Sequence, residues 1–169
     1  TGVVALADKF VSLDADATVN DLLVLQNGGI RTNNRLLTLG ENAVSTGNES
    51  LSTVADELAF LNSNQTSFVA LCTDAGIPVT TGGLKRLNLG SPGRTTAVGF
   101  PVGFTTPTDA ATTNFSPVQL QQNSGTMDNY TVRSITADSP PGTYSGSSVD
   151  FTYNILEDVP GGSNCTLRL

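Results

Sequence analysis

The chain has 169 residues, of which 14% are charged and 6% aromatic, and its formal net charge is −7. Charged residues usually make up about 25% of a globular domain. In this chain Thr, Ser, Asn and Gly take the place of many Lys and Glu residues, and such a composition is typical of a secreted β-protein. Eight basic residues are scattered along the chain, which argues against nucleic acid and anionic membranes as partners. No apolar run is long enough to cross a bilayer, which excludes membrane insertion by a helix. Since the chain begins at Thr1, we expect an extracellular or cell-surface protein whose leader has been removed.

The N-terminal segment, residues 1–13, is predicted to be an extended arm that is apolar on both faces. Such a segment has to be buried on both sides. It is either the first strand of its own domain or a strand inserted into a neighbouring copy, as in β-augmentation. The apolar residues that define this assembly arm are Val3, Val4, Leu6, Phe10 and Val11.

Oxygen-bearing side chains follow the arm at alternating positions. Asp14, Asp16 and Asp21 are candidate calcium ligands, because Ca²⁺ prefers oxygen atoms. The spacing lacks the glycine and the final glutamate of an EF-hand loop, and a polar strand end explains it equally well. We therefore predict neither a metal nor any other cofactor.

Two apolar runs come next, Asp21 to Leu25 and Ile30 onward, separated by Gln26-Asn27-Gly28-Gly29. This spacer is typical of a β-hairpin turn. The run from Arg35 to Leu39 predicts a further short strand. No internal repeat of useful length is visible.

Apolar residues at helical spacing interrupt the strand pattern between Leu51 and Leu61. With Asn48 or Ser50 as N-cap, they predict one short amphipathic helix that covers the sheets.

The two cysteines, Cys72 and Cys165, both lie in strand-like sequences. In a secreted chain such a pair predicts one disulfide bond, with two buried thiols as the alternative.

Strict alternation of apolar and polar residues predicts strands in the C-terminal half. Val98 to Phe104 alternates around Pro101, which places that segment at a sheet edge or a bulge. Val149 to Ile155 and Cys165 to Leu169 alternate in the same way. The fold class is therefore all-β: an Ig-like or jelly-roll β-sandwich over residues 14–169, with one short helix and the N-terminal arm.

Histidine is absent from the chain, which excludes Ser-His-Asp and Cys-His catalysis and most zinc sites. No glycine-rich phosphate-binding loop is present. The adjacent acids Asp56-Glu57 and Glu157-Asp158 are interpreted as solvated side chains rather than a glycosidase pair. We predict that the protein is not an enzyme.

Five Asn-X-Ser/Thr triplets are candidate N-glycosylation sites. Their asparagines are Asn48, Asn64, Asn114, Asn129 and Asn164.

The segment Ser139 to Gly146, followed by Val149 to Tyr153, resembles the closing hairpin of secreted fimbrial and spore-coat-U-like subunits. That resemblance implies an incomplete Ig-like sandwich and polymerisation by donor-strand exchange. The chain departs from this pattern by continuing to a further strand at Cys165.

These observations favour a structural subunit of an extracellular filament, pilus or surface coat that assembles with copies of itself by β-strand complementation. A viral coat or decoration protein is one alternative. A carbohydrate-binding adhesive module that contacts surface glycans is another. Such a module needs exposed aromatic side chains, and the chain has no Trp and three Tyr.

Overall fold

The computed structural model describes residues 10–20, 22–25, 28–40, 44–46, 68–77, 79–89, 97–106, 109–135 and 152–168. Every regular element among these residues is a β-strand, which confirms the all-β class. The predicted helix between Leu51 and Leu61, the Ser139–Gly146 hairpin and residues 1–9 of the arm lie outside the described residues. The strands are β1 (Phe10–Ser12), β2 (Ala17–Val19), β3 (Leu22–Val24), β4 (Gly29–Arg31), β5 (Leu36–Leu39), β6 (Val44–Thr46), β7 (Val69–Ala70), β8 (Gly83–Leu89), β9 (Val98–Phe100), β10 (Val102–Thr106), β11 (Asp109–Phe115), β12 (Val118–Ser124), β13 (Asp128–Ile135), β14 (Thr152–Glu157) and β15 (Asn164–Arg168).

The first six strands form two stacked coils of chain. Strands β1, β2 and β3 make the first coil, and β4, β5 and β6 lie parallel to them in the same order. The residues paired at the start of each strand are Phe10 with Gly29, Ala17 with Leu37, and Leu22 with Val44. One coil therefore takes about 20 residues, the repeat length of a β-solenoid.

This stacking corrects the predicted hairpin. Strands β3 and β4, which flank Gly28, belong to different sheets and do not pair with each other. The chain therefore passes from one sheet to another between β3 and β4. At the following corner, Asn33 and Asn34 adopt positive φ angles of 49° and 63°. Asparagine tolerates this left-handed conformation better than most residues, so the chain can turn sharply between β4 and β5.

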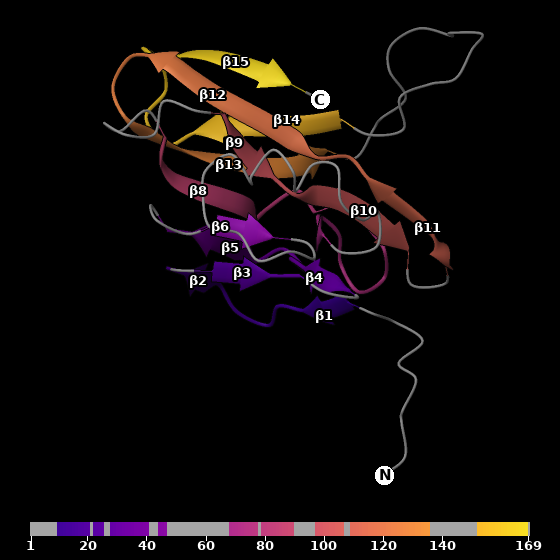
Figure 1. Cartoon of the computed structure of the whole chain (residues 1–169). Helices are drawn as coiled ribbons and strands as arrows, with labels where there is room; N and C mark the ends of the chain where they lie inside the picture. The colour runs from indigo at the N-terminus through magenta and orange to yellow at the C-terminus, as the bar shows by residue number, and fades with distance from the viewer. Residues whose placement is uncertain are drawn as a thin grey trace, which may run out of the picture.

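Two five-stranded sheets run through the whole molecule. Their orders are β1-β4-β7-β10-β11 and β14-β13-β8-β5-β2, and a three-stranded sheet β15-β12-β9 and the pair β3-β6 complete the set. In each five-stranded sheet the early strands are parallel, and the last strands are antiparallel. Figure 1 shows β1 to β6 gathered at one end of the molecule and β12 to β15 at the opposite end. Ig-like and jelly-roll sheets are antiparallel, so the parallel coils are a departure from both.

Pro101 separates β9 from β10, which join different sheets. Its missing N–H makes it unsuited to a strand interior, as expected from the sequence. Its carbonyl oxygen accepts a hydrogen bond from the Val69 amide at 2.8 Å. The alternating segment from Val98 to Phe104 is thus two strands with a corner between them.

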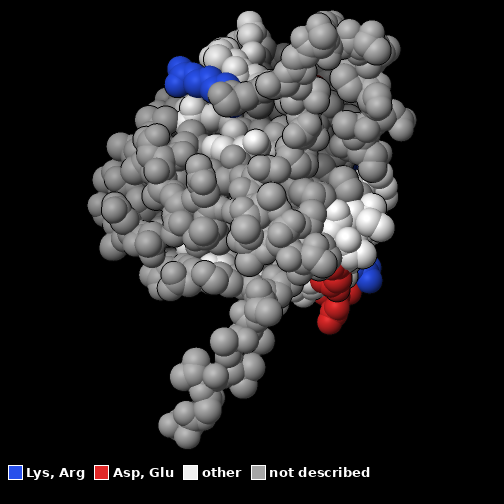
Figure 2. All heavy atoms as spheres, turned by 90° about the vertical axis from the view of Figure 1, so that its right-hand side faces the viewer, with Lys and Arg blue, Asp and Glu red and all other residues white. Residues whose placement is uncertain are grey.

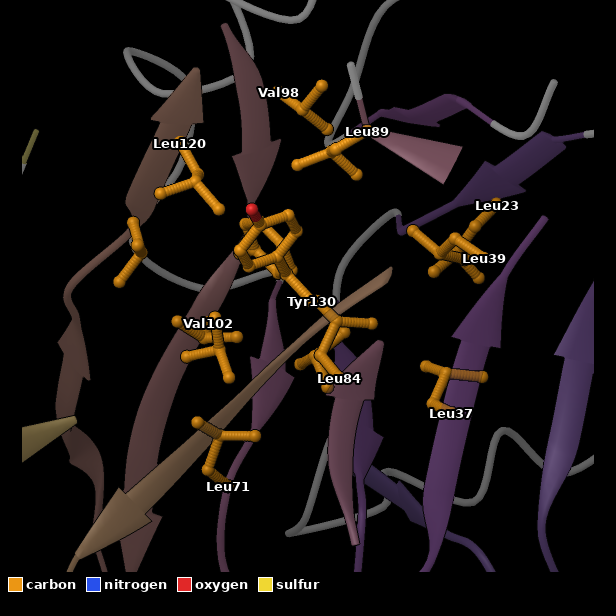
Figure 3. Close-up of a cluster of buried hydrophobic side chains, with 14 of the residues drawn as sticks. Leu23, Leu37, Leu39, Leu71, Leu84, Leu89, Val98, Val102, Leu120 and Tyr130 are labelled. Carbon is orange, nitrogen blue, oxygen red and sulfur yellow. The ribbon is translucent and has the colours of Figure 1, made fainter. Parts of the chain in front are cut away.

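One hydrophobic core joins the parallel and antiparallel strands. It contains Leu37 and Leu39 of β5, Leu84 of β8, Leu120 of β12 and Tyr130 of β13, each at most 3% exposed. In Figure 3 the Tyr130 ring lies between the side chains of Leu120 and Leu84. Because strands from both ends of the molecule share this core, they should unfold together.

Candidate functional site

Within the part of the chain that the structure describes, the first coil is the outermost layer of the hydrophobic core at one end. Ala17 and Val19 point toward the core but are only partly buried. Their partners in the second coil, Leu37 and Leu39, are 1% and 0% exposed. A stack of coils normally needs a polar terminal repeat to cover its last apolar layer. In this chain the last described layer is apolar on its inner side.

The same end carries the outer edge of two described strands. Strands β1 and β2 are the outermost strands of the two large sheets. The Val19 carbonyl accepts a hydrogen bond from the Gly40 amide at 2.8 Å, so Val19 faces β5. Backbone groups of successive residues in a strand point to opposite edges, and the Thr18 amide therefore points away from β5. Such an edge is a template for another strand.

The described part of the predicted arm belongs to this first coil. Residues Phe10 to Ser12 form β1 and pair with β4 of the same chain. Phe10 packs edge-on against Phe68 with ring centroids 5.0 Å apart, and the Arg31 guanidinium lies 5.3 Å from the Phe10 ring centroid. Val11, by contrast, is 69% exposed. The prediction of an arm buried on both faces is therefore wrong at this position, because the face that carries Val11 is exposed.

Of the predicted calcium ligands, Asp14 and Asp16 are exposed and Asp21 lies outside the described residues. Asp16 Oδ1 accepts a hydrogen bond from the Leu36 amide at 2.9 Å, which ties the first corner to the second. The described part of the chain contains no group of three His, Cys, Asp or Glu side chains that could hold a metal ion. Asp16 therefore has a structural role at the corner.

At the opposite end, the Tyr130 hydroxyl lies in a cluster of polar side chains. It is 3.2 Å from Cys165 Sγ, 3.3 Å from Glu157 Oε1 and 3.4 Å from Gln122 Oε1. Burial, followed by the contact with Cys165, raises the pKa of Tyr130 above its ordinary value. The phenol therefore stays neutral and holds β12, β13, β14 and β15 together.

A second polar group lies on the neighbouring surface. Lys85 Nζ donates to Asp158 Oδ2 at 2.6 Å, and Asn129 Nδ2 donates to the same oxygen at 2.8 Å. The hydrogen bond from Lys85 holds the pKa of the Asp158 carboxyl below its usual range. Asn129 Oδ1 accepts the Asn88 backbone amide at 2.9 Å. One carboxylate thus contacts both an amine and a carboxamide.

The acid pair Glu157-Asp158 fixes the turn after β14. Glu157 Oε2 accepts the Gly161 amide at 3.0 Å, while Asp158 binds Lys85. The two carboxylates contact different groups, as expected for adjacent residues near a strand end. The pair Asp56-Glu57 lies outside the described residues.

Three of the five asparagines in predicted glycosylation triplets are described. Asn164 is exposed at the start of β15, and Asn114 lies on β11. Asn129 lies on β13 between two other strands, and both ends of its amide are hydrogen-bonded. A glycan on Asn129 would have to displace these bonds. Asn48 and Asn64 are outside the described residues.

Both cysteines are free thiols in the structure, so the predicted disulfide is not formed there. Cys72 packs with Phe68 and Ala70 in a small cluster, separate from the main core that Cys165 contacts. Cys72 follows the end of β7, whereas Cys165 lies on β15 of the three-stranded sheet. Sequence reasoning also missed the group around Asp158, because its members come from two strands and from the turn after a third.

Figure 2 shows the described Lys, Arg, Asp and Glu side chains of one face as small isolated groups rather than a continuous charged patch. Within the described ranges no helix is long and apolar enough to span a membrane. Comparison of the chain with protein-family models, characterised proteins and solved structures finds no match.

Proposed function

We propose that this protein is a structural subunit of an extracellular filament or surface coat, and that copies join head to tail through the edges of their two large sheets. The observation that carries the proposal is that β2, the outermost described strand of its sheet, lies over a partly buried apolar layer. Strand addition at such an edge provides backbone hydrogen bonds and covers the exposed apolar side chains.

The arrangement of the sheets favours a second copy of the chain as the partner. One large sheet has β1 and β11 as its outer strands, and the other has β2 and β14. Placing the first coil of one copy against β11 and β14 of the next would continue both sheets at once. Two different surfaces then meet, and such a head-to-tail contact generates a filament when it does not close into a ring.

This proposal changes the mode of strand complementation expected from the sequence. The described part of the arm, β1, stays within its own sheet and forms part of the accepting edge. We also infer a sandwich-like arrangement in which the parallel coils replace half of an antiparallel sandwich. The low charge and the hydroxyl-rich composition support an extracellular location.

A proline scan of β2 tests the proposal. Thr18→Pro removes an amide that faces the free edge, so the fold should survive while assembly is lost. Val19→Pro is the matched control, because it disrupts the strand on the side that pairs with β5 and should destabilise the monomer. Thr18→Val, which keeps the amide, should assemble like the unmodified protein.

Light scattering and electron microscopy measure assembly, and circular dichroism measures folding. The expected result is concentration-dependent polymers for the unmodified chain and folded monomers for Thr18→Pro. Polymers of Thr18→Pro that equal those of the unmodified chain would refute the edge contact. An unmodified chain that stays monomeric at every concentration would refute the filament function itself.

A further inference from the structure

Three reactive side chains converge on the antiparallel side of the molecule. Lys85 lies on β8, Asn129 on β13 and Asp158 just beyond β14. Strand β13 lies between the other two in the same sheet. The three groups are far apart in sequence and are held together by the ladder of hydrogen bonds between these strands.

Asp158 Oδ2 brings the amine and the carboxamide together. It accepts hydrogen bonds from Lys85 Nζ at 2.6 Å and from Asn129 Nδ2 at 2.8 Å. Both nitrogen atoms are therefore neighbours of one oxygen atom. The Lys85 side chain is only 18% exposed, which limits the positions that its amine can occupy.

The Asn129 carbonyl is also held in a fixed position. Its Oδ1 accepts a hydrogen bond from the Asn88 amide at 2.9 Å. Asn88 itself has a positive φ of 56°, a conformation that is uncommon outside glycine. A backbone N–H at this oxygen polarises the carbonyl and stabilises negative charge that develops on it.

We propose that Lys85 and Asn129 form an intramolecular amide bond in the folded protein, with Asp158 as the proton carrier. Asp158 takes a proton from the Lys85 ammonium, and the free amine attacks Asn129 Cγ. Negative charge develops on Oδ1 beside the Asn88 amide. The bond from Cγ to Nδ2 then breaks, and Nδ2 leaves as ammonium after receiving protons through Asp158. One amide replaces another, so no oxidant or other reactant is required.

The direct alternative, an amide between Lys85 and Asp158, would require attack on the carboxyl of Asp158. The hydrogen bond from Lys85 lowers the pKa of this group. Asp158 is therefore ionised before the reaction begins, and a carboxylate anion is a poor electrophile. Asn129 is the better acceptor because its carbonyl is neutral and is bound by an N–H donor.

Intact-mass measurement of the full chain tests the proposal, which does not rest on the proposed assembly. The expected mass is lower than that of the sequence by one ammonia, with a crosslinked peptide that joins Lys85 to Asn129 after digestion. The crosslinked fraction should rise with incubation time at alkaline pH, because only the deprotonated amine attacks. Denatured protein should not form the bond, since the three strands are then separated.

Two variants serve as controls. Lys85→Arg keeps the positive charge but lacks a nucleophilic amine, so its mass should equal that of its sequence. Asp158→Asn keeps both reacting groups and removes the proton carrier, so its crosslinked fraction should rise more slowly. A loss of one water, a glycan on Asn129, or an unchanged mass after prolonged alkaline incubation of the folded protein would overturn the proposal.

Discussion

Strands β1 to β7 pair only in parallel, whereas the pairs made by β11 to β15 are all antiparallel. In the first six strands, each strand meets its partner only after the chain has passed through the other sheets, so paired residues are one coil apart. In the antiparallel part, β13 pairs with its sequence neighbour β14 and with the distant β8, while β12 pairs with the distant β9 and β15. Strand β8 belongs to both arrangements, because it is parallel to β5 and antiparallel to β13.

The two parts differ most in how their outer layers are closed. At the antiparallel end, the buried phenol of Tyr130 contacts the thiol of Cys165 and the carboxylate of Glu157. The ion pair between Lys85 and Asp158 lies at the same end. The first coil has instead a half-buried Val19 and an exposed Val11. Among the described residues, hydrogen-bonded polar side chains therefore cover the core at one end, while partly exposed apolar side chains lie at the other.

The largest expected effect comes from shortening a core side chain in the parallel part. Leu39→Ala should lower the free energy of unfolding by about 2–5 kcal/mol, because Leu39 is fully buried in the shared core. The same change should shift the unfolding reported by tyrosine fluorescence, since Tyr130 and Tyr153 lie in the antiparallel part and the chain has no Trp. Urea denaturation followed by both fluorescence and circular dichroism measures this coupling.

Val19→Ala is the matched control for Leu39→Ala, because the two residues pair across β2 and β5. Val19→Ala should lower the free energy of unfolding by less than Leu39→Ala, since Val19 is already partly exposed. Separate transitions for the two spectroscopic signals would show that the parallel and antiparallel parts unfold independently.

A smaller loss of stability is expected when one hydrogen bond between the two large sheets is removed. Tyr153 on β14 donates its hydroxyl proton to the carbonyl of Ser116, which follows β11, at 2.9 Å. Tyr153→Phe should lower stability at neutral pH by about 1 kcal/mol. Urea denaturation at a series of pH values is the measurement.

The pH dependence sharpens this test. Burial raises the pKa of Tyr153 to about 12, against about 10 for an unfolded tyrosine. Between these values the unfolded chain has released the proton and the folded chain has kept it, so stability falls as the pH rises. The Tyr153→Phe variant has no phenol to ionise at this position, so it does not lose stability in this way. The difference in free energy of unfolding between the unmodified protein and the variant should therefore shrink above about pH 10. A difference that stays constant over that range would contradict burial as the cause.

The smallest expected effect concerns the reactivity of the two thiols. Their accessibility to solvent differs between the parallel and the antiparallel part. Cys72 is fully buried beside β7, while Cys165 on β15 is only partly buried. Under native conditions an alkylating reagent should therefore modify Cys165 first and Cys72 only when the structure opens. Mass spectrometry of the unreduced protein over time measures both rates. A disulfide in protein from its natural source would contradict the free thiols.

Several features of the fold follow directly from the sequence. The alternation from Val98 to Phe104 correctly predicts extended chain, whereas Pro101, predicted at a sheet edge or a bulge, lies between two strands of different sheets. Strands β14 and β15 also lie where the alternating residues indicate them. Alternation is a local property, because it depends only on which side chains face the core, and the sequence displays it directly.

The choice of strand partners was decided by the tertiary structure alone. The residues around Gly28 are suited equally to a hairpin and to a corner between sheets, because both need a short turn. Backbone N–H and C=O groups are the same at every residue, so alternation specifies the face of a strand but not its neighbour. The stacking of the coils, the positions of the two thiols and the convergence of Lys85, Asn129 and Asp158 depend on that choice, since each brings together residues distant in the sequence.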